Sequence, residues 1–150
     1  SKIAYIDIKI ILNKSNVGKS LNSHLKSLNS EYSKKYTKIE KELLEKEKTL
    51  LAQKNIIKKN EFNKKIRNLS DEINKYKNDK KISTDKLNKI KIENTKEILR
   101  ILNPIITKYV ENNDISLVLK KTNIIVGKKD LDITEKIIKL LNREINKLNF

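Results

Sequence analysis

Residues 17–109 carry helix-forming residues almost throughout, with one glycine and one proline, and they repeat apolar side chains at helical spacing. In the first half, apolar positions follow one another by steps of three, four or seven, as they do along the seam of a coiled coil. These positions are Leu21, Leu25, Leu28, Tyr32, Tyr36, Ile39, Leu43, Leu50 and Ile57.

A second stripe begins at Phe62, five residues after Ile57, so the two stripes lie on different faces of a continuous helix. It consists of Phe62, Ile66, Leu69, Ile73, Tyr76, Leu87 and Ile90. One straight helix cannot bury both stripes against one partner. We therefore predict a long antiparallel coiled-coil hairpin, an arm over residues 17–109 with its tip near 58–63. A tip at 77–84 is the alternative, and it would join two helices of unequal length.

Polar residues interrupt the predicted seam of this hairpin. They are Lys46, Gln53, Asn60, Lys80, Ser83 and Asn94. Each stabilises a coiled coil less than Leu or Ile would at the same position. We expect the two helices to hold together near the ends of the chain and to loosen toward the tip.

Strand-like segments occur only at the two ends of the chain. Residues 2–8 alternate between two faces and are rich in β-branched and aromatic residues. Near the other end, "ISLVL" (115–119) and "NIIV" (123–126) are joined by "KKTN", which predicts an antiparallel β-hairpin. Asp132 and Glu135 then form a capping-box pattern for a C-terminal helix. One face of that helix is apolar: Ile133, Ile137, Ile138, Leu141, Ile145 and Leu148.

Three short strands make a poor sheet on their own, because both outer strands expose unpaired backbone groups. Association of several copies into a closed barrel removes these edges. We therefore predict an α+β, mostly helical fold, in which residues 1–16 and 110–150 form a β-barrel body shared between subunits, and the arm projects from it. The residues expected to build this oligomerisation body are Ile3, Tyr5, Ile6, Leu117, Val118, Leu119, Ile124, Ile125 and Val126.

Composition excludes several classes of function. The chain has no cysteine and one histidine, His24, so it offers no thiolate metal site and no nucleophile paired with a histidine base. Gly18 and Lys19 lack the spaced glycines of a phosphate-binding loop. We expect no enzymatic activity, no metal and no cofactor.

The net charge of +16 favours acidic partners such as nucleic acid, anionic lipid or acidic polypeptides. A general bias toward Lys, Asn and Ile explains the excess of lysine equally well. At the predicted tip, cations outnumber the single acid Glu61, and Phe62 lies among them. This tip is either a surface that contacts an acidic client or a solvated hairpin end. The candidate contact residues are Lys54, Lys58, Lys59, Phe62, Lys64, Lys65 and Arg67.

Four segments near the ends of the chain follow the order and spacing of a known family. They are "KIAYID" (2–7), Gly18–Lys19, "NNDISLVLKKTNIIVG" (112–127) and "DLDIT" (130–134), whereas the middle is similar in periodicity and length. With these segments the chain resembles the Skp/OmpH family of periplasmic chaperones. The resemblance implies a homotrimer with a β-barrel body and three helical arms around a cavity. It also implies an ATP-independent holdase for unfolded outer-membrane proteins, located in the periplasm and exported on a signal peptide that would precede residue 1. Contact with anionic membrane lipid or lipopolysaccharide is left open.

The alternative function is a basic, nucleic-acid-binding coiled coil, since +16 charges favour phosphate contact. No nucleic-acid-binding motif is present, and the lysines surround the helices instead of following one face. A spacer coiled coil is a third interpretation, but it does not explain the two ends of the chain.

Overall fold

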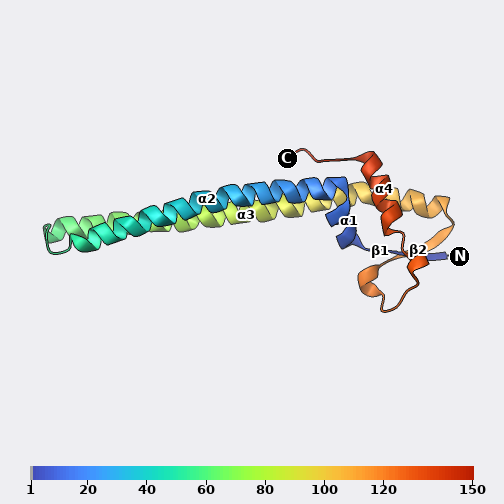
Figure 1. The fold of residues 1–150 in the computed structure, drawn as a ribbon, viewed down its shortest axis with the longest axis horizontal. Coiled ribbons are helices and arrows are strands. Elements are labelled where there is room, and N and C mark those ends of the chain that lie inside the picture. Colours follow the sequence, from blue (N-terminus) through green and yellow to red (C-terminus); the bar gives the residue numbers. More distant parts are fainter. Residues whose placement is uncertain (1) are drawn as a thin grey trace. The chain divides into compact units, whose positions relative to one another are not determined.

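The computed structural model describes residues 2–150 and confirms a mostly helical fold with a small sheet (Figure 1). The elements are β1 (Lys2–Ile6), α1 (Ile8–Lys14), α2 (Asn16–Ala52), α3 (Lys59–Asn112), β2 (Ile115–Lys120), two short 3-10 helices (Lys121–Asn123 and Lys129–Leu131) and α4 (Thr134–Glu144). The chain divides into two compact units. The first, which we call the body, comprises residues 2–25 and 90–150, and the second, the hairpin, comprises residues 26–89.

The body is larger than the predicted segments 1–16 and 110–150 because its core uses one end of each long helix. Val17 of α2 and Ile98 and Leu102 of α3 are buried together with Ile137 and Leu141 of α4. Of the apolar face predicted for the C-terminal helix, Ile137, Ile138 and Leu141 lie on α4. Ile133, Ile145 and Leu148 belong to the same core but lie outside the helix, which ends at Glu144. Burial of these aliphatic side chains supplies the main driving force for folding this unit.

A sharp corner joins α1 to α2 inside the body. Asp7 caps α1 by accepting a hydrogen bond from the Ile10 amide (3.1 Å), and Ser15 caps α2 by accepting one from the Gly18 amide (3.1 Å). At Gly18, a Cβ atom would lie only 1.8 Å from the carbonyl oxygen of Leu12. The close approach of the two helices therefore requires glycine at this position.

The start of α4 differs from the predicted capping box. The helix begins at Thr134, whose amide donates to Asp132 Oδ1 (3.0 Å), so Asp132 caps the helix from one residue further out than predicted. Thr134 Oγ1 also accepts a hydrogen bond from the Asp7 amide (2.9 Å), which ties α4 to the end of β1. The Glu135 side chain is exposed and makes no capping hydrogen bond at the start of α4, so the predicted capping box is wrong.

The sheet has two strands, and the predicted antiparallel hairpin is wrong. β1 and β2 pair in parallel, with Ile3 opposite Leu117 and Tyr5 opposite Leu119. Residues 124–128 form no strand, because the 3-10 helix after β2 redirects the chain toward the ring of Tyr5. The Tyr5 hydroxyl donates to the carbonyl oxygen of Lys128 (3.2 Å), which fixes this segment beside β1 instead of beside β2.

The hairpin joins α2 to α3 through residues 53–58 (Figure 1). The tip therefore lies about one helical turn earlier than the predicted range 58–63, and Phe62 belongs to the first turns of α3. The error arises because Ile57 lies in the turn, although its spacing places it in the first stripe. The alternative tip at 77–84 is excluded, since those residues are continuous helix in α3.

Candidate functional site

The described part of the chain contains no group of three or more His, Cys, Asp or Glu residues that could bind a metal ion. Among the same residues, no helix is both long enough and apolar enough to cross a membrane. The only histidine, His24, stacks on the ring of Phe150, with 4.2 Å between ring centroids. The candidate features described below are exposed surfaces, one on the body and several on the hairpin.

The face of the sheet directed away from the body core is apolar. A register shift between β1 and β2 places Ile115 and Val118 against the core, and Leu117 and Leu119 on the opposite face. About half of the Ile3 and Leu117 side chains is exposed there. Tyr5 shares this face but is covered by the segment 124–128, while Ile6 points into the core.

The segment that covers Tyr5 is itself apolar and exposed. Ile125 is fully exposed and Val126 is 88% exposed, whereas Ile124 is half-buried. β2 also pairs with β1 alone, so its other edge has no strand partner among residues 2–150. We call the set Ile3, Leu117, Leu119, Ile125 and Val126 the outer apolar face. Exposed apolar residues gathered on neighbouring segments are typical of surfaces that bind a partner.

The predicted cationic residues do gather at the hairpin tip. Lys54 and Lys58 lie in the turn, and Lys59, Lys64, Lys65 and Arg67 lie on the first turns of α3, all of them exposed. Phe62 is half-buried, so part of its ring closes the seam. Ile56, which the sequence analysis did not single out, is 80% exposed in the turn.

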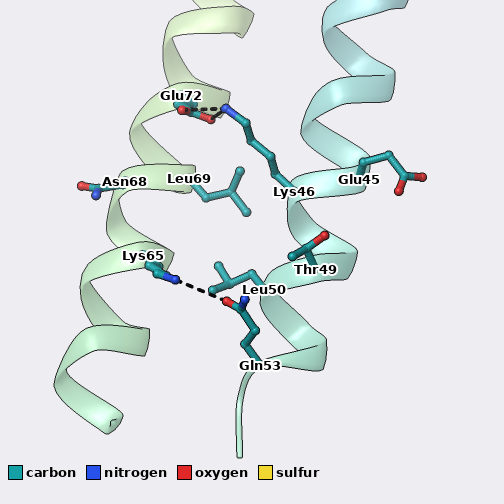
Figure 2. A pocket seen from close by; sticks show the side chains of 9 residues that line it. All are labelled: Glu45, Lys46, Thr49, Leu50, Gln53, Lys65, Asn68, Leu69 and Glu72. Carbon is teal, nitrogen blue, oxygen red and sulfur yellow. Dashed lines mark hydrogen bonds and ion pairs between the residues drawn. The ribbon is translucent and has the colours of Figure 1, made fainter. Parts of the chain in front are cut away.

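A groove of about 400 Å³ opens between α2 and α3 just before the turn (Figure 2). Its floor is the seam pair Leu50 and Leu69, and two polar bridges join the helices across it. Lys46 forms an ion pair with Glu72 (3.0 Å), and Lys65 donates to the side-chain oxygen of Gln53 (3.4 Å). Two residues predicted to weaken the seam, Lys46 and Gln53, thus have partners on the opposite helix.

Further along the hairpin, a buried tyrosine fixes the register of the two helices through hydrogen bonds across the seam. The Tyr36 hydroxyl donates to the carbonyl oxygen of Asp79 (2.9 Å), and the Ser83 hydroxyl lies 2.6 Å from it and completes the pairing. Tyr36 and Ser83 are both buried. A fully satisfied buried polar pair fixes the register of two helices, because a shift would leave both groups unpaired.

Next to this pair, Glu40 of α2 accepts hydrogen bonds from Tyr76 and from Lys80 (3.2 Å) of α3. The hydrogen bond from Tyr76, followed by that from Lys80, holds the pKa of the Glu40 carboxyl below its usual value. The hydrogen bond to Glu40 raises the pKa of the Tyr76 phenol, and the separate hydrogen bond from Lys80 to Glu40 raises the pKa of the Lys80 ammonium. These hydrogen bonds join α2 to α3 on the exposed side of the hairpin.

Comparison with known proteins agrees with this architecture. The sequence matches the family model described as outer membrane protein (OmpH-like) over residues 2–141. The chain belongs to this OmpH-like family. Its fold is similar to the crystal structure of a candidate outer membrane chaperone (OmpH-like) from Caulobacter crescentus, with a TM-score of 0.89 and 18% sequence identity. The similarity covers 99% of this chain and 88% of the Caulobacter chain. A search of curated proteins finds no match.

Proposed function

We propose that this OmpH-like protein is an ATP-independent holdase chaperone of the periplasm, which binds unfolded outer-membrane proteins and prevents their aggregation. Membership in the family and similarity to the fold of the Caulobacter protein support a chaperone role. The observation that carries the proposal is the outer apolar face of the body. Exposed apolar side chains do not stabilise an isolated chain, but their burial between several copies can hold those copies, and their hairpins, together.

Assembly follows from the same surface. Leu117 and Leu119 remain exposed beside an unpaired edge of β2, and Ile125 and Val126 are the most exposed apolar residues of the body. In the proposed homotrimer, the outer apolar face and the open edge of β2 pair with those of neighbouring copies and close a small barrel. Pairing with another strand satisfies the backbone groups of the edge, and burial of the apolar side chains drives association.

Client binding is then the task of the hairpins. An unfolded chain has no fixed shape, so weak contacts at many places suit it better than one tight pocket. Three hairpins around one client provide such contacts, and their linkage through the body raises the overall affinity without any strong single contact. The net charge of +9 on residues 26–89 adds attraction for an acidic client.

The proposal is tested by dilution of a denatured outer-membrane β-barrel protein into buffer with and without the purified chaperone, with light scattering as the readout. We expect the chaperone to suppress aggregation without ATP, and the suppression to weaken as salt screens the charges. Undiminished aggregation would contradict the proposal. Tight, salt-sensitive binding to duplex DNA together with that failure would favour the nucleic-acid-binding alternative instead.

The variant Val126→Asp separates assembly from folding. Val126 is 88% exposed, so an aspartate there leaves the fold of the single chain intact. In the proposed trimer the same charge would be buried between copies, at a large desolvation cost. We expect a folded monomer with much weaker suppression of aggregation. The control is Lys128→Asp, which changes charge in the same segment at an exposed polar position.

A further inference from the structure

The two flanks of the hairpin near its tip differ in chemistry. On one flank, the groove of Figure 2 is bridged by the ion pair of Lys46 with Glu72 and by the bond of Lys65 to Gln53. The opposite flank holds a second groove of about 350 Å³, and Leu51, Ile66 and Ile73 line it. The seam residues Leu50 and Leu69 separate the two grooves and line both of them.

The second flank carries a row of apolar residues over two heptads, beside the polar lining residues Glu47, Ser70, Asn74 and Lys77. Leu44 and Leu51 are seven residues apart on α2, and Ile66 and Ile73 are seven residues apart on α3, so each pair occupies one face of its helix. Leu44 is 52% exposed, Leu51 59% and Ile66 41%. We call these four residues the apolar flank. Exposed Leu and Ile residues at heptad intervals beside the seam make the apolar stripe wider than the interface between the two helices. Part of the stripe therefore stays exposed.

Charge indicates what covers this flank. Residues 26–89 carry 19 Lys and Arg against 10 Asp and Glu. The turn that follows Leu51 and precedes Ile66 adds the cationic tip, where Glu61 is the only acid between residues 53 and 67. A second copy of the hairpin would bring the same positive charge, and the two would repel each other. The matching occupant is therefore acidic.

The shape of the flank favours a polypeptide over a flat surface. Leu51 and Ile66 lie at the sides of the groove, and the floor is the buried Leu50 with Leu69. Single side chains of an extended polypeptide can enter such a groove from the solvent side. Acidic residues of the same chain can then reach the lysines of the tip.

We propose that the apolar flank is the surface of the hairpin that binds the client, and that it takes extended segments in which apolar residues are flanked by acidic ones. This inference rests on the proposed holdase function and assigns it to one side of the hairpin. The opposite flank, whose groove is crossed by polar bridges, contributes little to the contact.

Site-specific photo-crosslinking tests this inference. A photoreactive phenylalanine analogue is placed at Leu51 or Ile66 on the apolar flank and, as matched controls, at Thr49 or Asn68, which line only the opposite groove. The probe is an acidic unfolded outer-membrane barrel protein. We expect strong crosslinks from positions 51 and 66 and weak ones from 49 and 68. Equal yields from both flanks would overturn the inference.

Substitution provides a second, independent measurement. Leu44→Gln, Leu51→Gln and Ile66→Gln together remove apolar surface and keep helix-forming side chains. The control combines Thr49→Gln with Asn68→Gln. We expect about tenfold weaker client binding for the triple variant, which corresponds to about 1.4 kcal/mol, and unchanged binding for the control. Circular dichroism and native mass verify that both variants keep their helix content and assembly.

The outcomes separate this inference from the proposed function. If the wild-type chain suppresses aggregation but the triple variant binds the client normally, the holdase function stands and the assignment to the apolar flank is overturned. If the wild-type chain fails to suppress aggregation, the proposed function itself is overturned. Crosslinks between two hairpins in the absence of client would assign the flank to a second copy of the chain. A triple variant that binds the client normally but no longer binds anionic vesicles would assign the flank to a lipid surface. Either result would also overturn the inference.

Discussion

The body and the hairpin are made from the same lysine-rich chain but bury very different amounts of apolar surface. In the body, Ile11, Val17, Ile98, Ile137 and Leu141 are completely buried in one aliphatic cluster. In residues 26–89 only Tyr36, Leu50 and Ser83 are buried, and two of these three carry a hydroxyl group. Because burial of apolar surface dominates folding free energy, the body should be the stable unit and the hairpin the adaptable one.

This contrast matches the proposed division between assembly by the body and client capture by the hairpin. Assembly needs a surface with a fixed shape, and the aliphatic core holds β1, β2 and α4 in place behind the outer apolar face. Capture of an unfolded chain needs a surface that adjusts to many sequences. A hairpin whose helices are joined by a few bridges and one buried tyrosine can adjust, provided that its register is kept.

The largest expected effect comes from the body core. Leu141→Ala removes a completely buried side chain from a cluster that cannot collapse around it, so we expect a loss of about 4 kcal/mol in the free energy of unfolding. Urea denaturation followed by circular dichroism measures this loss at fixed protein concentration, since assembly also affects stability. A loss below about 1 kcal/mol would show that the body is not the stable unit.

A matched leucine in the hairpin should matter less and only locally. Leu50→Ala removes a seam residue that lies between two open grooves, so water and neighbouring side chains can fill the space. We expect the free energy of unfolding to fall by about 2 kcal/mol, at the low end of the range for Leu→Ala substitutions. Hydrogen exchange should accelerate for amides of residues 26–89 and stay unchanged around α4. Faster exchange throughout the body would refute the separation of the two units.

The buried tyrosine should contribute less than Leu50, but with a distinct signature. Tyr36→Phe keeps the ring and removes the hydroxyl that Asp79 and Ser83 share, which costs about 1 kcal/mol. If this bond fixes the register, a disulfide between cysteines placed at positions 46 and 72 should form readily in the wild-type background and less readily in the Tyr36→Phe background. Equal rates of formation would assign the register to the apolar seam instead.

The smallest expected effect is a dependence on pH at Glu40. The pKa of the Glu40 carboxyl is lowered in the folded chain, so ionised Glu40 stabilises the fold. This stabilisation is fully present above the unfolded pKa of 4.5 and is lost as the pH falls through the lower pKa of the folded chain. Glu40→Gln keeps an acceptor for Tyr76 and does not titrate. Tyrosine fluorescence, which is not masked because the chain has no tryptophan, should show an acid transition in the wild type that is reduced in the variant. Identical acid transitions would refute a role for Glu40.

The sequence predicts the hairpin well because a change of stripe is a local signal. The step from Ile57 to Phe62 requires the chain to turn, and α2 and α3 indeed meet there. The exact turn was misplaced, since the spacing of Ile57 does not reveal that its backbone has left the helix. The strand predicted at 123–126 failed for a different reason. Strand propensity is local, whereas the hydrogen bond from Tyr5 to Lys128 joins residues 123 positions apart.

The candidate surfaces divide in the same way. The cations expected at the tip do lie there, because six cations within fourteen residues gather wherever the turn falls, while their contact with a client stays a prediction. The apolar flank was not predicted, because Ile66 and Ile73 were assigned to the seam and Leu44 and Leu51 lie next to the seam positions Leu43 and Leu50. The signal that could have found it is the doublet of leucines at 43–44 and again at 50–51, one heptad apart. The second leucine of each pair has no place in the seam and must face elsewhere.

Native mass spectrometry of the purified protein with an unfolded outer-membrane barrel protein tests the central claim most directly, because it measures assembly and client binding together. The claim is that the body gathers three hairpins around one client. We predict a complex of three chains in the absence of client, and three chains with one client after mixing. A monomer at micromolar concentration, or a complex of one chain with one client, would contradict it.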